Sequence, residues 1–283
     1  MRTQAIAYSR LSRLAAAALI AISRGGLTAL VLGLVFLPDL GLANQLRLIR
    51  TFAAVFLVPA FAAWFLERAC AAMVSIEGGT LVVERRGQRT EVPAESIAGV
   101  VPWWVPLPSS GVWLRLKSGR RLRLGLQLHD PVRFIAAIAD AGAPEHVRAA
   151  SRRRAIVYAS AKHGRPSRWD QPLLKFVVFA LVPAVPLFRL NQWIVYGGTF
   201  GEYYTYGLQA YLLALAIYWA ALTIYLVLYA AVLRVVTETI ALPVTWMVPS
   251  RAVPVRRALE LVNRIFYYGA VLAFLVRLYL QSE

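Results

Sequence analysis

Few side chains in this sequence could carry catalytic or metal chemistry. The chain has one cysteine, Cys70, and three histidines in 283 residues, which excludes an internal disulfide framework and a multi-cysteine metal site. It contains no Walker phosphate loop, no H-E-x-x-H, no G-x-S-x-G and no C-x-x-C. His129 has no second histidine or cysteine near it in sequence, so we expect it to be a loop residue. We therefore expect no catalytic residues, no metal ion and no cofactor.

Polar residues inside apolar stretches are the next chemical signal. Glu260 and Arg264 stand four residues apart, the favourable order for a helical ion pair, and Asn263 shares their side of the helix. Ionisable groups within a membrane span usually face protein or a water-filled cavity. This side is therefore a polar cleft or subunit contact, or else an internal ion pair with side chains that snorkel to the interface.

Glu238 lies in a second such stretch, which Pro243 and Pro249 interrupt. Non-helical backbone at membrane depth needs protein cover. The pattern indicates a re-entrant or interfacial segment at 235–250, with Arg264 as a candidate partner for Glu238.

Basic residues are in large excess, with 31 Lys and Arg against 14 Asp and Glu and a formal net charge of +17. Cations near an acidic leaflet gain binding energy. We expect anionic lipid headgroups or an acidic partner to bind at two clusters, at Arg115, Lys117, Arg121 and Arg123, and at Arg152, Arg153 and Arg154. A nucleic-acid role is not expected, because the sequence shows no recognition fold.

The elements that carry these residues are set by composition, since 59% of the residues are hydrophobic and only 16% are charged. A membrane span needs roughly 20 apolar residues. Five stretches qualify, and we expect an α-helical transmembrane bundle with spans at about 26–42, 51–71, 173–188, 206–232 and 259–280. The expected domains are 1–25, 26–73, 74–142, 143–172 and 173–283, of which 143–172 is a basic helix with a linker.

Lys and Arg predict the orientation. They precede the first span and fill the stretch between the second and third, while the loop from about 190 to 205 has none. The chain is thus expected in a bacterial inner (cytoplasmic) membrane, with its N-terminus cytoplasmic and its C-terminus periplasmic; Arg47 and Arg50 do not fit. Segment 1–25 is an interfacial helix or an extension of the first span, and a removable signal peptide is a further alternative.

The insert at 74–142 has short alternating runs bounded by glycine and proline, which predict antiparallel strands. In the hairpin at 112–126, only an odd connection leaves one apolar face. We therefore expect Leu116 opposite Leu122, Leu114 opposite Leu124 and Val112 opposite Leu126. The same register sets Arg115 beside Arg123 and Lys117 beside Arg121 on the outer face.

Two further signals complete the insert. Asp130, Pro131 and Gly142 bound a short helix as N-cap, first residue and stop. Trp103 and Trp104, between two prolines, either dip into the membrane interface or close the core, and we favour the interface.

This insert resembles the pleckstrin-homology-like (PH-like) domains of bacterial membrane proteins. The residues that carry the resemblance are Thr80 to Glu84, Val92 with Ile97, the hairpin Gly111 to Leu126, and Asp130 to Ala141. The resemblance implies a small antiparallel β fold closed by a C-terminal helix and a role in scaffolding or membrane-surface binding, with no catalytic residues. The insert departs from the family in its small number of expected strands.

We thus expect a non-enzymatic subunit, scaffold or regulator of a membrane assembly, in contact with anionic lipids and other membrane subunits. The alternatives are a transporter or channel component with a polar path along the fifth span, and a membrane enzyme acting on lipid or glycan.

Overall fold

The computed structural model describes residues 2–37, 39, 41, 44–103, 107–162 and 171–280. The chain forms two compact units, each built from segments that are distant in sequence. The first unit comprises Met1–Arg24, Leu57–Gly164 and Ile240–Arg256. The second comprises Gly25–Phe56, Arg165–Thr239 and Arg257–Glu283.

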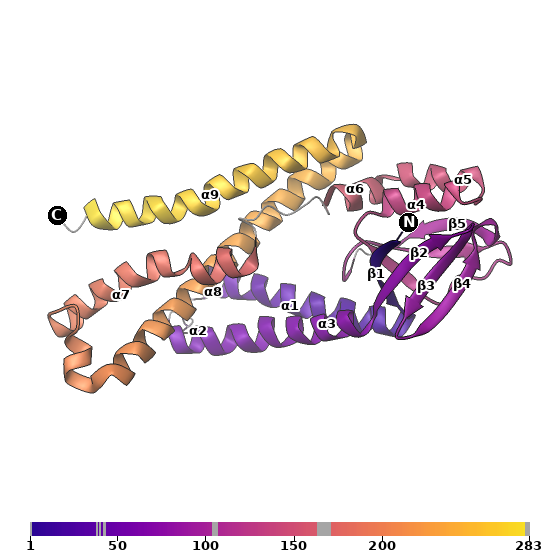
Figure 1. Ribbon diagram of the computed structural model, residues 1–283. Helices are drawn as coiled ribbons and strands as arrows, with labels where there is room; N and C mark the ends of the chain where they lie inside the picture. The colour runs from indigo at the N-terminus through magenta and orange to yellow at the C-terminus, as the bar shows by residue number, and fades with distance from the viewer. Residues whose placement is uncertain are drawn as a thin grey trace. The chain divides into compact units, whose positions relative to one another are not determined.

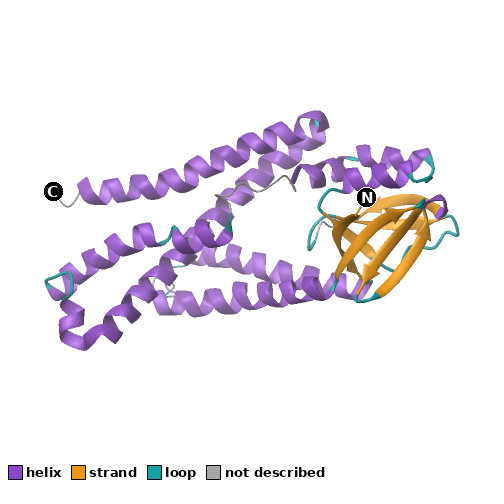
Figure 2. Ribbon diagram, in the orientation of Figure 1, coloured by secondary structure: helices purple, strands orange, loops and turns teal. Residues whose placement is uncertain are grey.

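Seven antiparallel strands among the described residues form one curled sheet in the first unit (Figure 1; orange in Figure 2). Their order across the sheet is β4-β3-β2-β1-β7-β6-β5. The strands are β1 (Arg2–Tyr8), β2 (Ala71–Glu77), β3 (Thr80–Arg85), β4 (Gln88–Pro93), β5 (Ile97–Pro102), β6 (Gly111–Leu116) and β7 (Gly125–Leu128). A 3-10 turn, η3 (Ala94–Ser96), connects β4 to β5.

The N-terminal strand β1 lies in the middle of this sheet, between β2 and β7. Ile6 pairs with Ala71 of β2 on one side and with Gln127 of β7 on the other. The expectation that 1–25 is an interfacial helix is therefore wrong for residues 2–8. The sheet module is not a continuous insert, because one of its strands precedes the first long helix.

Helix α4 (Pro131–Asp140) covers the inner face of the sheet. Inner-face side chains such as Ala5, Leu81 and Leu126 form the main core with this helix. As the sequence predicts, Asp130 caps α4 by accepting from the Arg133 amide at 3.1 Å, and Pro131 is its first residue. The remaining helices of this region are α5 (Glu145–Ala149), η4 (Ala150–Arg152) and α6 (Arg154–Lys162).

Within the described residues, five helical segments are long and apolar enough to cross a membrane. They are α1 (Arg10–Phe36); α2 (Gln45–Phe52) with η2 (Ala53–Leu57) and α3 (Val58–Ala69); η6 (Leu173–Val178) with α7 (Leu181–Tyr196); α8 (Gly201–Met247); and η7 (Pro249–Arg251) with α9 (Ala252–Leu280). The predicted number of long apolar helices is confirmed. Most of the helices extend beyond the predicted spans.

Helix α8 corrects another expectation. It remains helical through Met247 with Pro243 inside it, so residues 235–247 are not a non-helical re-entrant segment. Threonine hydroxyls add hydrogen bonds to backbone carbonyls in this part of the helix, since Thr239 donates to the Val235 carbonyl and Thr245 to the Ala241 carbonyl. The backbone of α8 breaks instead at Gly207, whose φ of 85° favours glycine.

In the second unit, aromatic side chains bind backbone carbonyls of the π-helical segment η6. A π-helix displaces the usual hydrogen-bond pattern of an α-helix. Tyr267 of α9 donates to the Lys175 carbonyl at 2.9 Å, and Trp219 of α8 donates to the Val177 carbonyl at 2.8 Å. These contacts connect three long helices through their polar groups.

Candidate functional site

The basic hairpin, residues Arg115 to Arg123, keeps the predicted parity but not the predicted register. Its loop is odd, since the Leu116 amide donates to the Arg120 carbonyl at 2.8 Å and Gly119 has a φ of 76°. Val112 lies opposite Leu126 as expected. Nearer the loop, however, Arg115 pairs with Arg121, and Leu122 donates to the Leu114 carbonyl.

The predicted pairs of Leu116 with Leu122, Leu114 with Leu124, Arg115 with Arg123 and Lys117 with Arg121 are therefore wrong by two residues. Two extra residues bulge on the second strand, between Arg121 and Leu126, where residues 123 and 124 bend. An even shift keeps every side chain on its face. Consequently all four predicted cations are exposed, namely Arg115, Lys117, Arg121 and Arg123. Arg120, which was not among the predicted binding residues, is exposed with them.

The basic hairpin lies near the end of β2 that is opposite to its connection with α3. The Lys117 amide donates to the Ser96 carbonyl in η3, and the Ala94 amide donates to the Gly79 carbonyl in the β2–β3 turn, both at 2.8 Å. The chain joins α3 to β2 at the other end of β2, next to Ala71. Seven residues of strand, roughly 20 Å, separate the two ends of β2.

The other predicted binding residues of the first unit have different environments. Arg152, Arg153 and Arg154 are exposed where η4 ends and α6 begins. Trp103 is only 5% exposed and packs with Tyr8 and Trp113 on the outer face of the sheet. The predicted insertion of Trp103 into the membrane interface is therefore wrong, because protein covers its ring. Trp104 lies outside the described residues.

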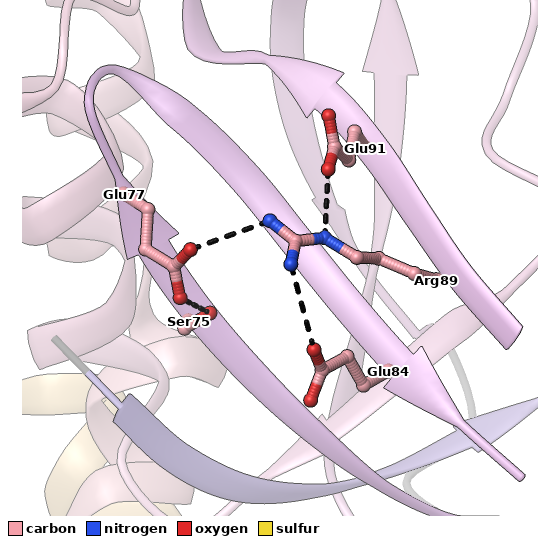
Figure 3. A network of polar contacts seen from close by, with 5 residues as sticks. All are labelled: Ser75, Glu77, Glu84, Arg89 and Glu91. Carbon is pink, nitrogen blue, oxygen red and sulfur yellow. Dashed lines mark hydrogen bonds and ion pairs between the residues drawn. The ribbon is translucent and has the colours of Figure 1, made fainter. Parts of the chain in front are cut away.

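An ion-pair network on the outer face of β2, β3 and β4 was not predicted from the sequence. Arg89 contacts three carboxylates, with Nε 2.7 Å from Glu91, Nη2 3.4 Å from Glu77 and Nη1 3.9 Å from Glu84 (Figure 3). Ser75 donates to Glu77 at 2.7 Å. Three carboxylates around one guanidinium make this face acidic. The signal for this network in the sequence is the short spacing between Glu84 and Arg89, which the register of β3 and β4 sets opposite each other.

Tyr8 is the buried titratable group where the sheet meets the helices. Its side chain is fully buried in a cluster with Ala16, Cys70, Trp103 and Trp113. Burial, with the nearby Glu67 carboxylate as a second cause, raises the pKa of Tyr8 far above its ordinary value. The Arg13 guanidinium lies 4.2 Å from the centroid of the Trp103 ring, so a cation also covers the cluster.

The polar residues predicted to lie within the membrane, Glu238, Glu260, Asn263 and Arg264, are partly covered by protein. Glu238 forms an ion pair with Arg234 of the same helix, at 3.2 Å. Asn263 donates a hydrogen bond to Thr237 of α8. Glu260, Asn263 and Arg264 are all half-buried, and Tyr267 on the same side of α9 is fully buried. The structure thus places this side of α9 in helix packing.

Within the part of the chain that the structure describes, no group of three or more His, Cys, Asp or Glu could hold a metal ion. The chain matches no family of known proteins, no curated protein and no solved structure.

Proposed function

We propose that this chain is a non-enzymatic membrane protein that anchors a PH-like docking module to the bilayer and serves as a scaffold or subunit of a membrane assembly. Anchoring is supported by large apolar side chains that remain exposed along the long helices, among them Val35, Phe61, Ile194, Leu213 and Ile265, each at least 59% exposed. The module's strand order, with helix α4 after the last strand, supports the PH-like resemblance.

The basic hairpin is the docking surface, and its partner is an acidic protein surface. Among the described residues, no carboxylate pairs with Arg115, Lys117, Arg121 or Arg123, although Arg115 and Arg121 lie directly opposite each other. Like charges opposite each other destabilise a sheet. A binding function gives a reason for retaining them, since complementary charge steers association.

Location favours a protein partner over the bilayer. The hairpin lies at the end of β2 that is remote from α3, and α3 is one of the helices expected in the membrane. The electrostatic attraction between a cation and this bilayer is small once the cation is more than a Debye length, about 8–10 Å, from the membrane surface.

The packing of the polar side of α9 argues against a polar transport path along this helix. Asn263 and Tyr267 use their polar groups in contacts with neighbouring helices. Such hydrogen bonds stabilise helix packing in lipid.

Purification of the full-length chain from its native membrane in mild detergent tests the proposal. We expect an acidic protein at fixed stoichiometry, released as salt is raised. The double variant Arg121→Glu/Arg123→Glu should reduce its recovery about tenfold or more. The matched control Arg86→Glu/Arg133→Glu changes the same charge at exposed positions of the unit outside both predicted basic clusters, and it should retain the partner. Unchanged recovery with the hairpin variant, or recovery of anionic lipid alone, would contradict the proposed partner.

A further inference from the structure

A groove of about 580 Å³ lies between the outer face of the sheet and the C-terminal end of α3, within the first unit. Its floor comes from strands β1, β2, β3 and β7, and its wall comes from Trp64, Glu67 and Arg68. This volume is typical of sites for small ligands. The groove is separate from the proposed docking surface and was not predicted from the sequence.

The groove carries both signs of charge. Arg68 contributes a guanidinium cation to its lining and His129 contributes an imidazole, while Glu67 and Glu84 contribute carboxylates. Of the three carboxylates around Arg89, Glu84 has the longest contact, at 3.9 Å, which leaves its oxygens able to accept from a ligand. A lining of this kind suits a zwitterion better than a simple anion, because an anion would meet two carboxylates.

Gln127 specifies the chemistry of one end of the ligand. Gln127 lines the groove, and its side-chain oxygen is buried and has no hydrogen-bond partner among the described residues. A buried acceptor without a donor costs free energy, and a ligand that supplies an N–H group would recover it. A primary ammonium has three such donors, whereas a quaternary ammonium has none.

The wall of the groove indicates where the ligand comes from. Trp64 is 48% exposed, and Phe61 and Phe65 are exposed on the same helical turns. Tryptophan is enriched at the headgroup level of bilayers. Trp64 is five residues before the end of α3, roughly 8 Å along the helix. If α3 crosses the membrane, the groove therefore opens at the headgroup layer.

We propose that this groove binds the headgroup of a zwitterionic phospholipid with a primary ammonium, an inference that rests on the proposed membrane anchoring. The phosphate contacts Arg68 and His129, and the ammonium donates to Glu84 and to the Gln127 amide oxygen. The acyl chains leave past Trp64 toward the bilayer.

Titration calorimetry of the full-length protein in a non-ionic detergent tests this site. The probe is dihexanoyl phosphatidylethanolamine, compared with dihexanoyl phosphatidylcholine and dihexanoyl phosphatidylglycerol. We expect the ethanolamine lipid to bind about tenfold more tightly than either of the other two, because only it carries both a phosphate and a donating ammonium. Equal affinities for the three lipids would overturn the proposal.

Two variants locate the binding. Glu84→Gln and Gln127→Leu should each weaken the ethanolamine lipid by about tenfold. Glu91→Gln is the matched control, because Glu91 also contacts Arg89 on this face but does not line the groove. It should change the affinity less than about twofold. Wild-type affinity in Glu84→Gln would overturn the assignment, provided that gel filtration shows each variant folded.

Free phosphoethanolamine separates a lipid from a soluble ligand. It should bind at least about tenfold more weakly than the lipid, because it lacks the chains that pass Trp64. Equal affinity would overturn the lipid source. The variant Arg121→Glu/Arg123→Glu should bind the lipid normally, so a failed docking surface is distinguishable from a failed groove. Failure of membrane anchoring would be seen separately, as extraction of the chain by alkaline carbonate without detergent.

Discussion

At the scale of single residues, the aromatic cluster around Tyr8 joins the sheet to the helices of its unit. The Tyr8 ring lies 6.2 Å from that of Trp103, which lies 6.2 Å from Trp113, and Ala16 of α1 and Leu66 of α3 pack against them. Gly125 belongs to the same contact, because a Cβ there would lie 3.0 Å from the Trp113 ring. These rings provide an apolar area on the outer face of the sheet, and α1 and α3 pack against that area.

Tyr8 makes this junction sensitive to alkaline pH. Its raised pKa means that the folded protein keeps the hydroxyl proton when the unfolded chain, with an ordinary tyrosine pKa of about 10, loses it. The stabilisation is complete below about pH 10 and is lost as the pH rises toward the folded value. Tyr8→Phe removes this dependence.

Thermal melting in detergent between pH 8 and 11.5 should show similar Tm values for wild type and Tyr8→Phe below pH 10. Above it, the wild-type Tm should fall faster by about 2–4 °C per pH unit. Parallel curves over the whole range would show that Tyr8 ionises without cost.

At the scale of elements, β1 is the strand on which the module depends. Without β1 the sheet divides into β4-β3-β2 and β7-β6-β5, because β1 supplies the pairing on both sides. Its inward residues Ala5 and Ala7 are almost fully buried in the main core, whereas the neighbouring Gln4 is exposed.

Ala5→Asp should therefore unfold the module, since an unpaired buried carboxylate costs several kcal/mol. Gln4→Asp adds the same charge one position away on the exposed side and should leave the fold intact. Limited proteolysis within 71–162, read by mass spectrometry, measures the difference. Equal protection of the two variants would mean that β1 is not part of the folded sheet in solution.

The sequence was informative about elements in proportion to how local their signals are. The Asp130-Pro131 cap, the odd hairpin loop and the apolar helices depend on residues close in sequence, and each was predicted. The pairing of β1 with β2 brings together residues 65 to 73 positions apart, with two apolar helices between them, and no local pattern indicates such a contact. The bulge near Arg123 was missed for a related reason, since alternation fixes the face of each residue but not its partner.

The candidate surfaces follow the same division. The exposure of the four hairpin cations could be expected from the alternation of side chains alone. The burial of Trp103 could not, because residues of α1 and α3 that are distant in sequence cover its ring only in the folded unit. The groove was inaccessible to sequence reasoning, since its lining comes from four strands and a helix.

At the scale of the whole molecule, charge and the five long helices predict one arrangement across the membrane. Lys and Arg are concentrated between residues 68 and 168, and the turn at 197–200 between α7 and α8 contains none. The positive-inside rule therefore predicts that the sheet module is cytoplasmic and that the 197–200 turn is on the opposite side.

The lone cysteine makes this arrangement directly testable. Cys70 is buried and accepts a hydrogen bond from Arg85, so Cys70→Ser gives a cysteine-free background that retains an acceptor there. Ser118→Cys adds an exposed thiol at the basic hairpin, and Gly198→Cys adds one where a Cβ meets no atom within 4 Å.

In intact cells, a membrane-impermeant maleimide should label Gly198→Cys and leave Ser118→Cys unlabelled, because only the 197–200 turn is predicted to face outward. After detergent permeabilisation both should react to completion, which controls for thiol accessibility. Labelling of Ser118→Cys in intact cells would place the sheet module outside. The acidic partner proposed for the basic hairpin would then have to be sought outside the cytoplasm, while the groove, which depends only on the exit of α3 from the bilayer, would keep its proposed ligand.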